Sequence, residues 1–238
     1  MTDRLDVGAV IRRVFDIYVD QYSVLLPASA VVFVITGIVS ALLVAAAPGL
    51  ALIALLLSLI AGTLFTGMVV ELVSDVQDGR RDHSAGELLR AATPVLGQLI
   101  LVGIVAGIGI LIGFFLIIVP GLILLTIWSV AAPVVVLERP GVFAALSRSR
   151  ELVRGNGWQV FGVIFVLFVL VIIVSSAIQI GAESAGTGAG IVARVILGIL
   201  TGPISGLAAA VLYFDLRAAS GERVGEDRPL APNPPPIS

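Results

Sequence analysis

Residues 91–137 read AATPVLGQLILVGIVAGIGILIGFFLIIVPGLILLTIWSVAAPVVVL and contain no charged side chain. One transmembrane helix needs about 20 apolar residues, so this stretch is about twice the length of a single crossing. Val119-Pro120-Gly121 lies near its middle. Because proline lacks a backbone donor and glycine relaxes the backbone, a turn is expected there. The stretch therefore predicts two spans, with Pro120-Gly121 as a hairpin tip, a kink or a re-entrant turn.

Two further stretches show the same double length and the same central interruption. Tyr22–Val70 carries Ala47-Pro48-Gly49, and Trp158–Phe214 carries a polar turn between Gly181 and Gly190 that includes Glu183. We therefore expect an all-α fold, a polytopic membrane bundle of six transmembrane helices arranged as three hairpins. The expected spans are residues 23–46, 50–73, 95–118, 121–137, 158–181 and 191–214.

The composition points to the same class of protein. Of the 238 residues 58% are hydrophobic and 13% are charged, whereas a soluble domain has about 25% charged residues. The mean hydropathy is +1.13. Cysteine is absent and there is one histidine, which excludes thiolate metal sites, cysteine nucleophiles and sites that need two histidines. The first apolar run is longer than the hydrophobic region of a signal peptide, so no cleaved signal is expected.

The placement of the 14 basic residues, all arginines, predicts the orientation. Thirteen of them precede, separate or follow the expected hairpins and therefore fall on one side of the membrane; only Arg194 falls on the other. Arginine and lysine concentrate in cytoplasmic loops. We therefore expect a multi-pass protein of the bacterial cytoplasmic (inner) membrane with its N- and C-termini in the cytoplasm.

A short charged segment with helical periodicity precedes each expected hairpin. Residues 1–21 and 141–155 each place apolar side chains on one face, and the segment near 84–93 begins with the capping-box spacing of Ser84 and Glu87. We expect three amphipathic helices along the inner leaflet. The transmembrane domain is then residues 22–217, followed by a disordered, proline-rich cytoplasmic tail at 218–238. The apolar faces are Val7, Val10, Ile11, Val14 and Tyr18 in the first segment, and Val142, Ala145, Leu146, Ser149, Leu152 and Val153 in the third.

Polar groups inside the expected spans are scarce. A charge at the middle of a span costs about 2.5–3.5 kcal/mol, and the spans carry none away from their ends except Arg194, so an ion-coupled pump is not expected. Gln98 and Gln179 are the strongest uncharged candidates. They either form interhelical hydrogen bonds of about 1 kcal/mol or line a small polar cavity.

The segment Arg148–Trp158 (RSRELVRGNGW) is the most informative polar stretch. Three arginines precede a tryptophan, and indole rings prefer the level of the lipid headgroups. Near an anionic surface each arginine contributes about 1 kcal/mol. These residues are either ordinary anchors or a headgroup site for anionic phospholipid, shared with Glu138 or with the Tyr213–Arg217 end. The candidate interface residues are Arg148, Arg150, Arg154, Trp158 and Arg217.

A set of short motifs in this region resembles a known family. They are Pro120-Gly121, Pro133, Glu138, Ala145, Arg148-Ser149, Leu152, Gly155, Trp158 and the closing LYFDLR of residues 212–217. The pattern resembles the membrane domain of glycerophosphoryl diester phosphodiesterases and related bacterial inner-membrane proteins, over most of residues 5–217. The resemblance implies a membrane-embedded helical module. It implies no phosphodiesterase activity here, because the barrel's metal-binding carboxylates and histidine pair are not expected in this chain.

The spans carry no nucleophile–base pair, paired acids or metal ligands, so an enzyme or a cofactor is not expected. We expect a non-catalytic, lipid- or envelope-associated structural or accessory module whose partners are membrane lipids, with a second copy or another membrane protein left open and nucleic acid excluded. The alternative is a transporter or flippase-like conduit for a small or lipidic molecule, with a cavity near Gln98 and Gln179. A wet cavity that reaches mid-membrane would favour the conduit, and a packed core with only lipid-facing grooves would favour the module.

Overall fold

The computed structural model describes residues 5–77, 93–183 and 187–221, and within these ranges the chain is helical, with short turns and no strands. Six helical segments are long and apolar enough to cross a membrane, judged by length and composition. The predicted all-α class is confirmed, and the six segments agree with a helical membrane bundle. They are Tyr22–Ala46, Pro48–Gln77, Leu96–Leu116, Ile118–Leu137, Gly157–Ala182 and Val192–Ala219.

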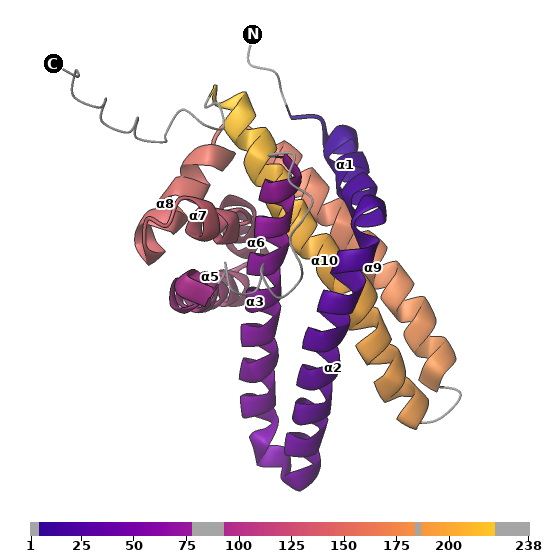
Figure 1. Cartoon of the computed structure of the whole chain (residues 1–238). Coiled ribbons are helices and arrows are strands. Elements are labelled where there is room, and N and C mark those ends of the chain that lie inside the picture. Colours follow the sequence, from indigo (N-terminus) through magenta and orange to yellow (C-terminus); the bar gives the residue numbers. More distant parts are fainter. Residues whose placement is uncertain (1–4, 78–92, 184–186, 222–238) are drawn as a thin grey trace, which may run out of the picture.

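The helices form consecutive pairs that pack side by side, α2 with α3, α5 with α6, and α9 with α10. In Figure 1, α2 and α3 run down the page whereas α5 is seen nearly end-on, so the second pair lies across the direction of the first. The sequence did not predict this arrangement. The elements in chain order are α1 (Val7–Asp20), α2 (Tyr22–Ala46), η1 (Pro48–Leu50), α3 (Ala51–Gln77), η2 (Thr93–Val95), α5 (Leu96–Leu116), α6 (Ile118–Ile127), α7 (Ala131–Leu137), α8 (Val142–Val153), α9 (Gly157–Glu183) and α10 (Thr187–Ala219).

The turn of the second pair lies earlier than Pro120-Gly121. The chain reverses at Ile117, whose backbone is extended with φ −160° and ψ 143°, and α6 begins at the next residue. Pro120 and Gly121 therefore lie in the first turn of α6 and not at the tip. Proline fits this position because the first amides of a helix have no acceptor within the helix. The first turn is where the sequence predicts it, at Ala47 and η1.

The expected fourth span consists of two helices. α6 ends at Ile127, a turn occupies residues 128–130, and α7 begins at Ala131. Pro133 then falls in the first turn of α7, where its missing N–H costs nothing. Trp128 and Ser129 lie in this turn and line the cavity described below.

The core lies at one end of the molecule, where α3, α7, α8 and α10 meet. α10 is the central helix, because it packs against α1, α2, α3, α7, α8 and α9. In the most apolar part of α10 half of the residues are buried, whereas in the corresponding part of α9 only 11% are buried. Most of α9 therefore presents apolar side chains to its surroundings. Such exposed apolar surface is what a bilayer would cover. Core residues include Val69, Val70 and Val73 of α3, Val134, Val135 and Val136 of α7, and Leu207, Val211 and Tyr213 of α10.

Two short amphipathic helices close this end. α1 packs on α9 and α10 and buries Val10 and Val14, and α8 packs on α7 and α5 and buries Ala145, Ser149 and Leu152. These side chains belong to the faces that the sequence predicts, and both faces lie against protein. The segment near 84–93 lies outside the described residues except for Thr93, and so does the tail beyond residue 221.

Pro203 lies inside α10 without ending the helix. Because proline has no N–H, the carbonyl of Ile199 four residues earlier receives no bond from position 203. The hydroxyl of Ser29 on α2, 0% exposed, reaches the Ile199 oxygen at 3.0 Å and the Leu26 oxygen of its own helix at 3.0 Å. The single Ser29 proton is shared between these two carbonyls, so Ser29 offers the Ile199 oxygen a shared donor from a neighbouring helix in place of the one that Pro203 removes.

Ser29→Ala is expected to lower the free energy of unfolding by about 1 kcal/mol, because the partly buried hydrogen bond to the Ile199 carbonyl is lost. In a Pro203→Ala background the helix restores its own bond, so the same substitution should cost close to nothing. The measurement is a double-mutant cycle by SDS unfolding in mixed micelles. Ser205→Ala is the control, since its hydroxyl bonds only within α10, to Gly202 at 3.0 Å. An equal cost of Ser29→Ala in both backgrounds would contradict this account.

Candidate functional site

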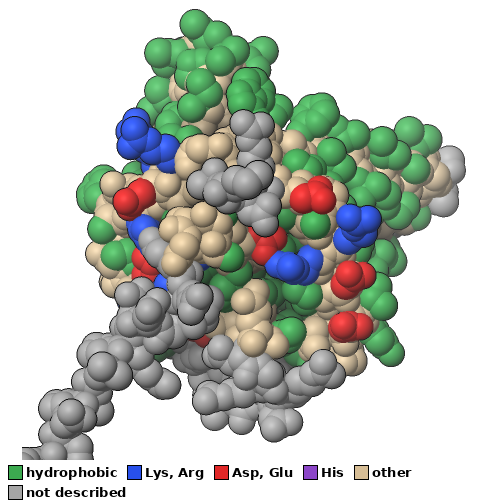
Figure 2. Space-filling model, turned by 90° about the horizontal axis from the view of Figure 1, so that it is seen from above, with side chains coloured by type: hydrophobic (Ala, Val, Ile, Leu, Met, Phe, Trp, Pro, Cys, Tyr) green, Lys and Arg blue, Asp and Glu red, His purple; other side chains and the backbone are tan. Residues whose placement is uncertain are grey.

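Charged side chains gather at the end of the molecule that holds the core. Figure 2 looks onto this end and shows arginine and acidic side chains interspersed on it, with hydrophobic lobes projecting beyond. An ion pair between Arg13 and Asp215 joins α1 to α10 here. The uneven distribution of charge agrees with the placement of arginines in the sequence, while the side of the membrane that this end faces stays a prediction.

Glu138, at the end of α7, is the centre of a polar network that connects α7, α8 and α10. Tyr213 donates its hydroxyl to Glu138 Oε1 at 2.8 Å, and Arg148 donates Nε to Oε2 at 3.1 Å. Arg217 donates Nη1 to the Tyr213 hydroxyl oxygen at 3.1 Å and lies over its ring, 5.7 Å from the centroid. Arg148 and Arg217, two of the five candidate interface residues, are thus engaged inside the protein.

A tight connection between α7 and α8 positions this network. Arg139 has φ 52° and Gly141 has φ 91°, so the backbone is left-handed on both sides of Pro140. The reversal brings Arg148 back to Glu138 although ten residues separate them. Ser149, one residue further, donates to the carbonyl of Ile127 at 2.8 Å. Since Ile127 ends α6, this bond satisfies one of the carbonyls that a helix C-terminus leaves open.

The other three candidate residues lie together on a separate surface. Arg150 and Arg154 are exposed, and their guanidinium groups form no hydrogen bond or ion pair with the described residues. Both line a hollow of about 720 Å³ that we call the basic hollow. Trp158 is 84% exposed and stands beside it at the start of α9. The basic hollow is lined by Ile127, Ser147, Arg150, Glu151, Val153, Arg154, Gly155 and Gly157.

An apolar groove of about 550 Å³ runs between α6 and α9 next to the basic hollow. Trp158 and Phe161 form its α9 side, and their rings meet edge-to-face with centroids 6.1 Å apart. The groove and the basic hollow share Ile127, Gly155 and Gly157, so they adjoin. The remaining lining residues of the apolar groove are Val119, Leu122, Ile123 and Thr126.

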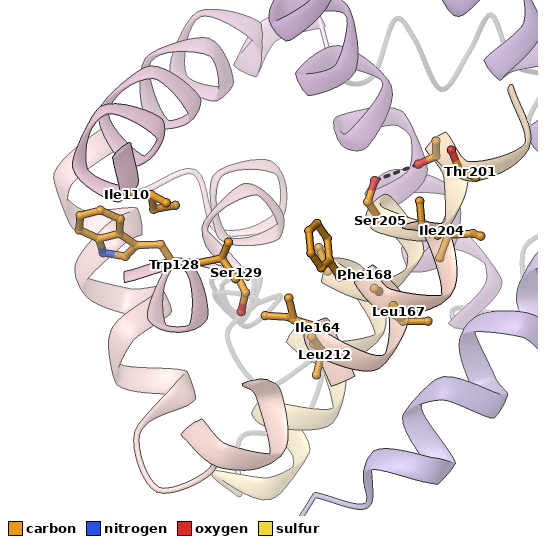
Figure 3. Close-up of a pocket in the computed structure, with 15 residues that line it drawn as sticks. Ile110, Trp128, Ser129, Ile164, Leu167, Phe168, Thr201, Ile204, Ser205 and Leu212 are labelled. Atoms are coloured by element: carbon orange, nitrogen blue, oxygen red, sulfur yellow. Dashed lines mark hydrogen bonds between the residues drawn. The ribbon is translucent and has the colours of Figure 1, made fainter. Parts of the chain in front are cut away.

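A third hollow, a cavity of about 510 Å³, lies between α5, α6, α9 and α10 (Figure 3). Ile110, Trp128 and Phe168 are among its mostly apolar lining residues, and Ser129, Thr201 and Ser205 contribute hydroxyls. Thr201 and Ser205 donate to carbonyls of their own helix at 2.7 and 3.0 Å, whereas the buried Ser129 Oγ has no hydrogen-bond partner among the described residues.

Neither of the predicted intramembrane polar residues lines this cavity. Gln98 lies in the first turn of α5 and Gln179 in the last two turns of α9. The structure therefore offers a space between helix pairs, as the conduit alternative requires, but not at the residues that the sequence suggested. Ser129, in the turn at residues 128–130, lines the cavity instead.

Together the six apolar segments and the clustered charges define the class, a multi-pass integral membrane protein made of helices. The chain belongs to the family described as "Domain of unknown function (DUF8558)", whose model matches residues 88–216, more than half of the chain. The matched range covers α5 to α9 and most of α10. It includes Glu138, Arg148 and Tyr213 of the network, the basic hollow and the apolar groove, and it ends one residue before Arg217.

Curated relatives of the chain are also described as membrane proteins. A UPF0259 membrane protein of Pectobacterium carotovorum subsp. carotovorum (strain PC1) is 34% identical over 99 residues, 42% of this chain and 39% of that protein. A UPF0259 membrane protein of Yersinia pestis (strain Pestoides F) is 30% identical over 99 residues, 42% of this chain and 38% of that protein. The match thus spans about two fifths of the length of these relatives. No solved structure matches the chain.

Proposed function

We propose that the protein is a non-catalytic accessory module of the bacterial inner membrane that associates with lipids. The observation that supports this is the basic hollow adjoining the apolar groove, because the two together match the two ends of a membrane lipid. Its relatives are described as UPF0259 membrane proteins.

The arrangement of polar groups supports a non-catalytic role. Asp215 pairs with Arg13, and Glu138 accepts bonds from Tyr213 and Arg148. The buried Ser29 and Ser149 hydroxyls donate to backbone carbonyls. A nucleophile needs an adjacent base within hydrogen-bond reach, and these groups serve helix packing instead.

We further propose that the three helix pairs cross the membrane six times with both termini in the cytoplasm. Gly49→Cys and Ile117→Cys, at the tips of the first two pairs, should react with a membrane-impermeant maleimide added outside the cell. Arg12→Cys should react only after permeabilisation. The native chain has no cysteine, so each label reports one position. A Cβ at Gly49 meets no atom within 4 Å, and Ile117 is 64% exposed, so both sites tolerate the change.

The two tip positions separate two outcomes. Labelling of position 49 from the cytoplasm alone would reverse the proposed orientation. Protection of position 117 from both sides, with position 49 labelled from outside, would mean that the second pair, which lies across the first in Figure 1, stays within the membrane instead of crossing it.

The conduit remains the second candidate, because the cavity between α5, α6, α9 and α10 carries the buried Ser129 hydroxyl. The test is reconstitution into liposomes with fluorescent phospholipids and an entrapped dye. An accessory module should retain co-purified phospholipid and leave both the transbilayer movement of lipid and the release of dye at the rate of protein-free liposomes. Faster transbilayer movement of lipid, or faster release of dye, would contradict the proposed function and support the conduit.

A further inference from the structure

We infer that one anionic glycerophospholipid molecule occupies the basic hollow and the apolar groove together. Its phosphate lies between Arg150 and Arg154, and an acyl chain follows the groove between α6 and α9. This inference rests on the proposed function and names the ligand of that surface.

Charge at the basic hollow is the first argument. Arg150 and Arg154 are four residues apart, which places them on one side of α8 and its end. Neither guanidinium group forms a hydrogen bond or an ion pair with another described residue. The carboxylate in the hollow, Glu151, is 71% exposed and contacts Arg148 at 3.4 Å. Two guanidinium groups are therefore left for an anion, and guanidinium matches phosphate oxygens in bidentate geometry.

The shape and chemistry of the apolar groove are the second argument. Its volume of about 550 Å³ falls within the range of about 300–1,000 Å³ typical of small-ligand sites. Val119 and Ile123 on the α6 side are 59% and 54% exposed, so the groove is uncovered along its length. A hydrocarbon chain would cover these side chains and lose no hydrogen bond. Trp158 stands at the junction with the basic hollow, at the level where indole rings meet headgroups.

The open boundary between the basic hollow and the apolar groove is the third argument. Gly155 and Gly157 form part of it, and a Cβ at either position would meet no heavy atom within 4 Å. The headgroup end and the chain end are therefore connected by open space. A single molecule with a charged head and an apolar tail fits this geometry, whereas a soluble anion would leave the groove uncovered.

The experiment is native mass spectrometry of the full chain, purified in mild detergent and incubated with equimolar phosphatidylglycerol and phosphatidylcholine. The wild-type protein should retain phosphatidylglycerol in preference to phosphatidylcholine. Arg150→Ala/Arg154→Ala should lower phosphatidylglycerol retention by roughly tenfold or more, since each surface arginine contributes to the attraction of anionic lipid. Arg12→Ala/Arg194→Ala removes the same charge from exposed positions elsewhere and should leave retention unchanged.

Gly157→Leu tests the groove separately, because it keeps every charge and places a side chain in the shared wall. It should lower retention of both lipids, and the open space around position 157 allows the fold to accept it. Unchanged phosphatidylglycerol retention in the double arginine variant, or an equal loss in its charge-matched control, would overturn the inferred site. Unchanged retention in Gly157→Leu would overturn the groove as the place of the chain. A wild-type protein that retains no phospholipid would contradict the proposed function itself.

Discussion

Glu138→Ala is expected to lower the free energy of unfolding by about 2–4 kcal/mol. The Glu138 and Arg148 side chains are 23% and 21% exposed, and the Tyr213 hydroxyl that Glu138 accepts belongs to a residue with 0% exposure. Removing one partner of a buried ion pair costs about 3–5 kcal/mol because the other charge is left without compensation, and partial exposure reduces that cost. Tyr213 would also lose its acceptor inside the protein. SDS titration in mixed micelles, followed by circular dichroism, measures the change.

Glu151→Ala is the matched control for this substitution. Glu151 contacts the same guanidinium, Arg148 Nη1, at 3.4 Å, but its side chain is 71% exposed. An exposed ion pair contributes at most about 1 kcal/mol. Equal costs for the two substitutions would show that Glu138 is an ordinary surface residue. A Glu138→Gln/Tyr213→Phe double-mutant cycle should give a coupling above about 0.5 kcal/mol, as expected for residues in direct contact.

Gly113→Ala should lower the free energy of unfolding by about 1–3 kcal/mol, the usual cost of overpacking. A Cβ at Gly113 would lie 2.9 Å from both Cα and N of Gly121 on α6. These are backbone atoms, so no side-chain rotation can make room and the two helices must separate. The same substitution would disturb the groove beyond α6, and thermal unfolding in detergent together with phosphatidylglycerol retention would report both effects.

Gly107→Ala provides the comparison within the same helix. A Cβ at Gly107 meets nothing within 4 Å. Alanine also has the higher helix propensity, by about 1 kcal/mol in a helix interior. The variant should therefore be neutral or more stable than the wild type. If Gly107→Ala and Gly113→Ala are equally destabilising, the close approach of α5 and α6 is not what Gly113 provides.

The network around Glu138 and the proposed lipid site share one short helix. Successive residues of an α-helix are about 100° apart, so Arg148 and Arg150 point in nearly opposite directions, and Arg154 returns to the side of Arg150. One side of α8 holds the protein together through Arg148, and the other leaves two arginines exposed. Loss of Glu138 should therefore also weaken lipid retention, because it loosens the helix that carries Arg150.

The apolar stretches alone determine that the protein is helical and built from six long apolar segments. In a bilayer every backbone amide must find its partner within the segment, which leaves helices as the outcome for sequences of this length. The buried faces of α1 and α8 were equally predictable, because these helices carry polar residues on the opposite side. The gathering of charged side chains at one end of the molecule was predictable from the positions of the arginines between the apolar stretches.

Only the tertiary structure decides how these helices pack. The long helices are apolar on every side, so their sequences have no periodicity that marks a packed face. The direction of the α5–α6 pair depends on contacts between residues far apart in the chain. The same is true of the hydrogen bond from Ser29 to the Ile199 carbonyl. The same holds for the arginines, since RSRELVR contains no signal that Arg148 meets Glu138 while Arg150 and Arg154 stay exposed. The path of the chain through Arg139 and Gly141 makes that distinction, because it sets which side of α8 lies against α7 and α10.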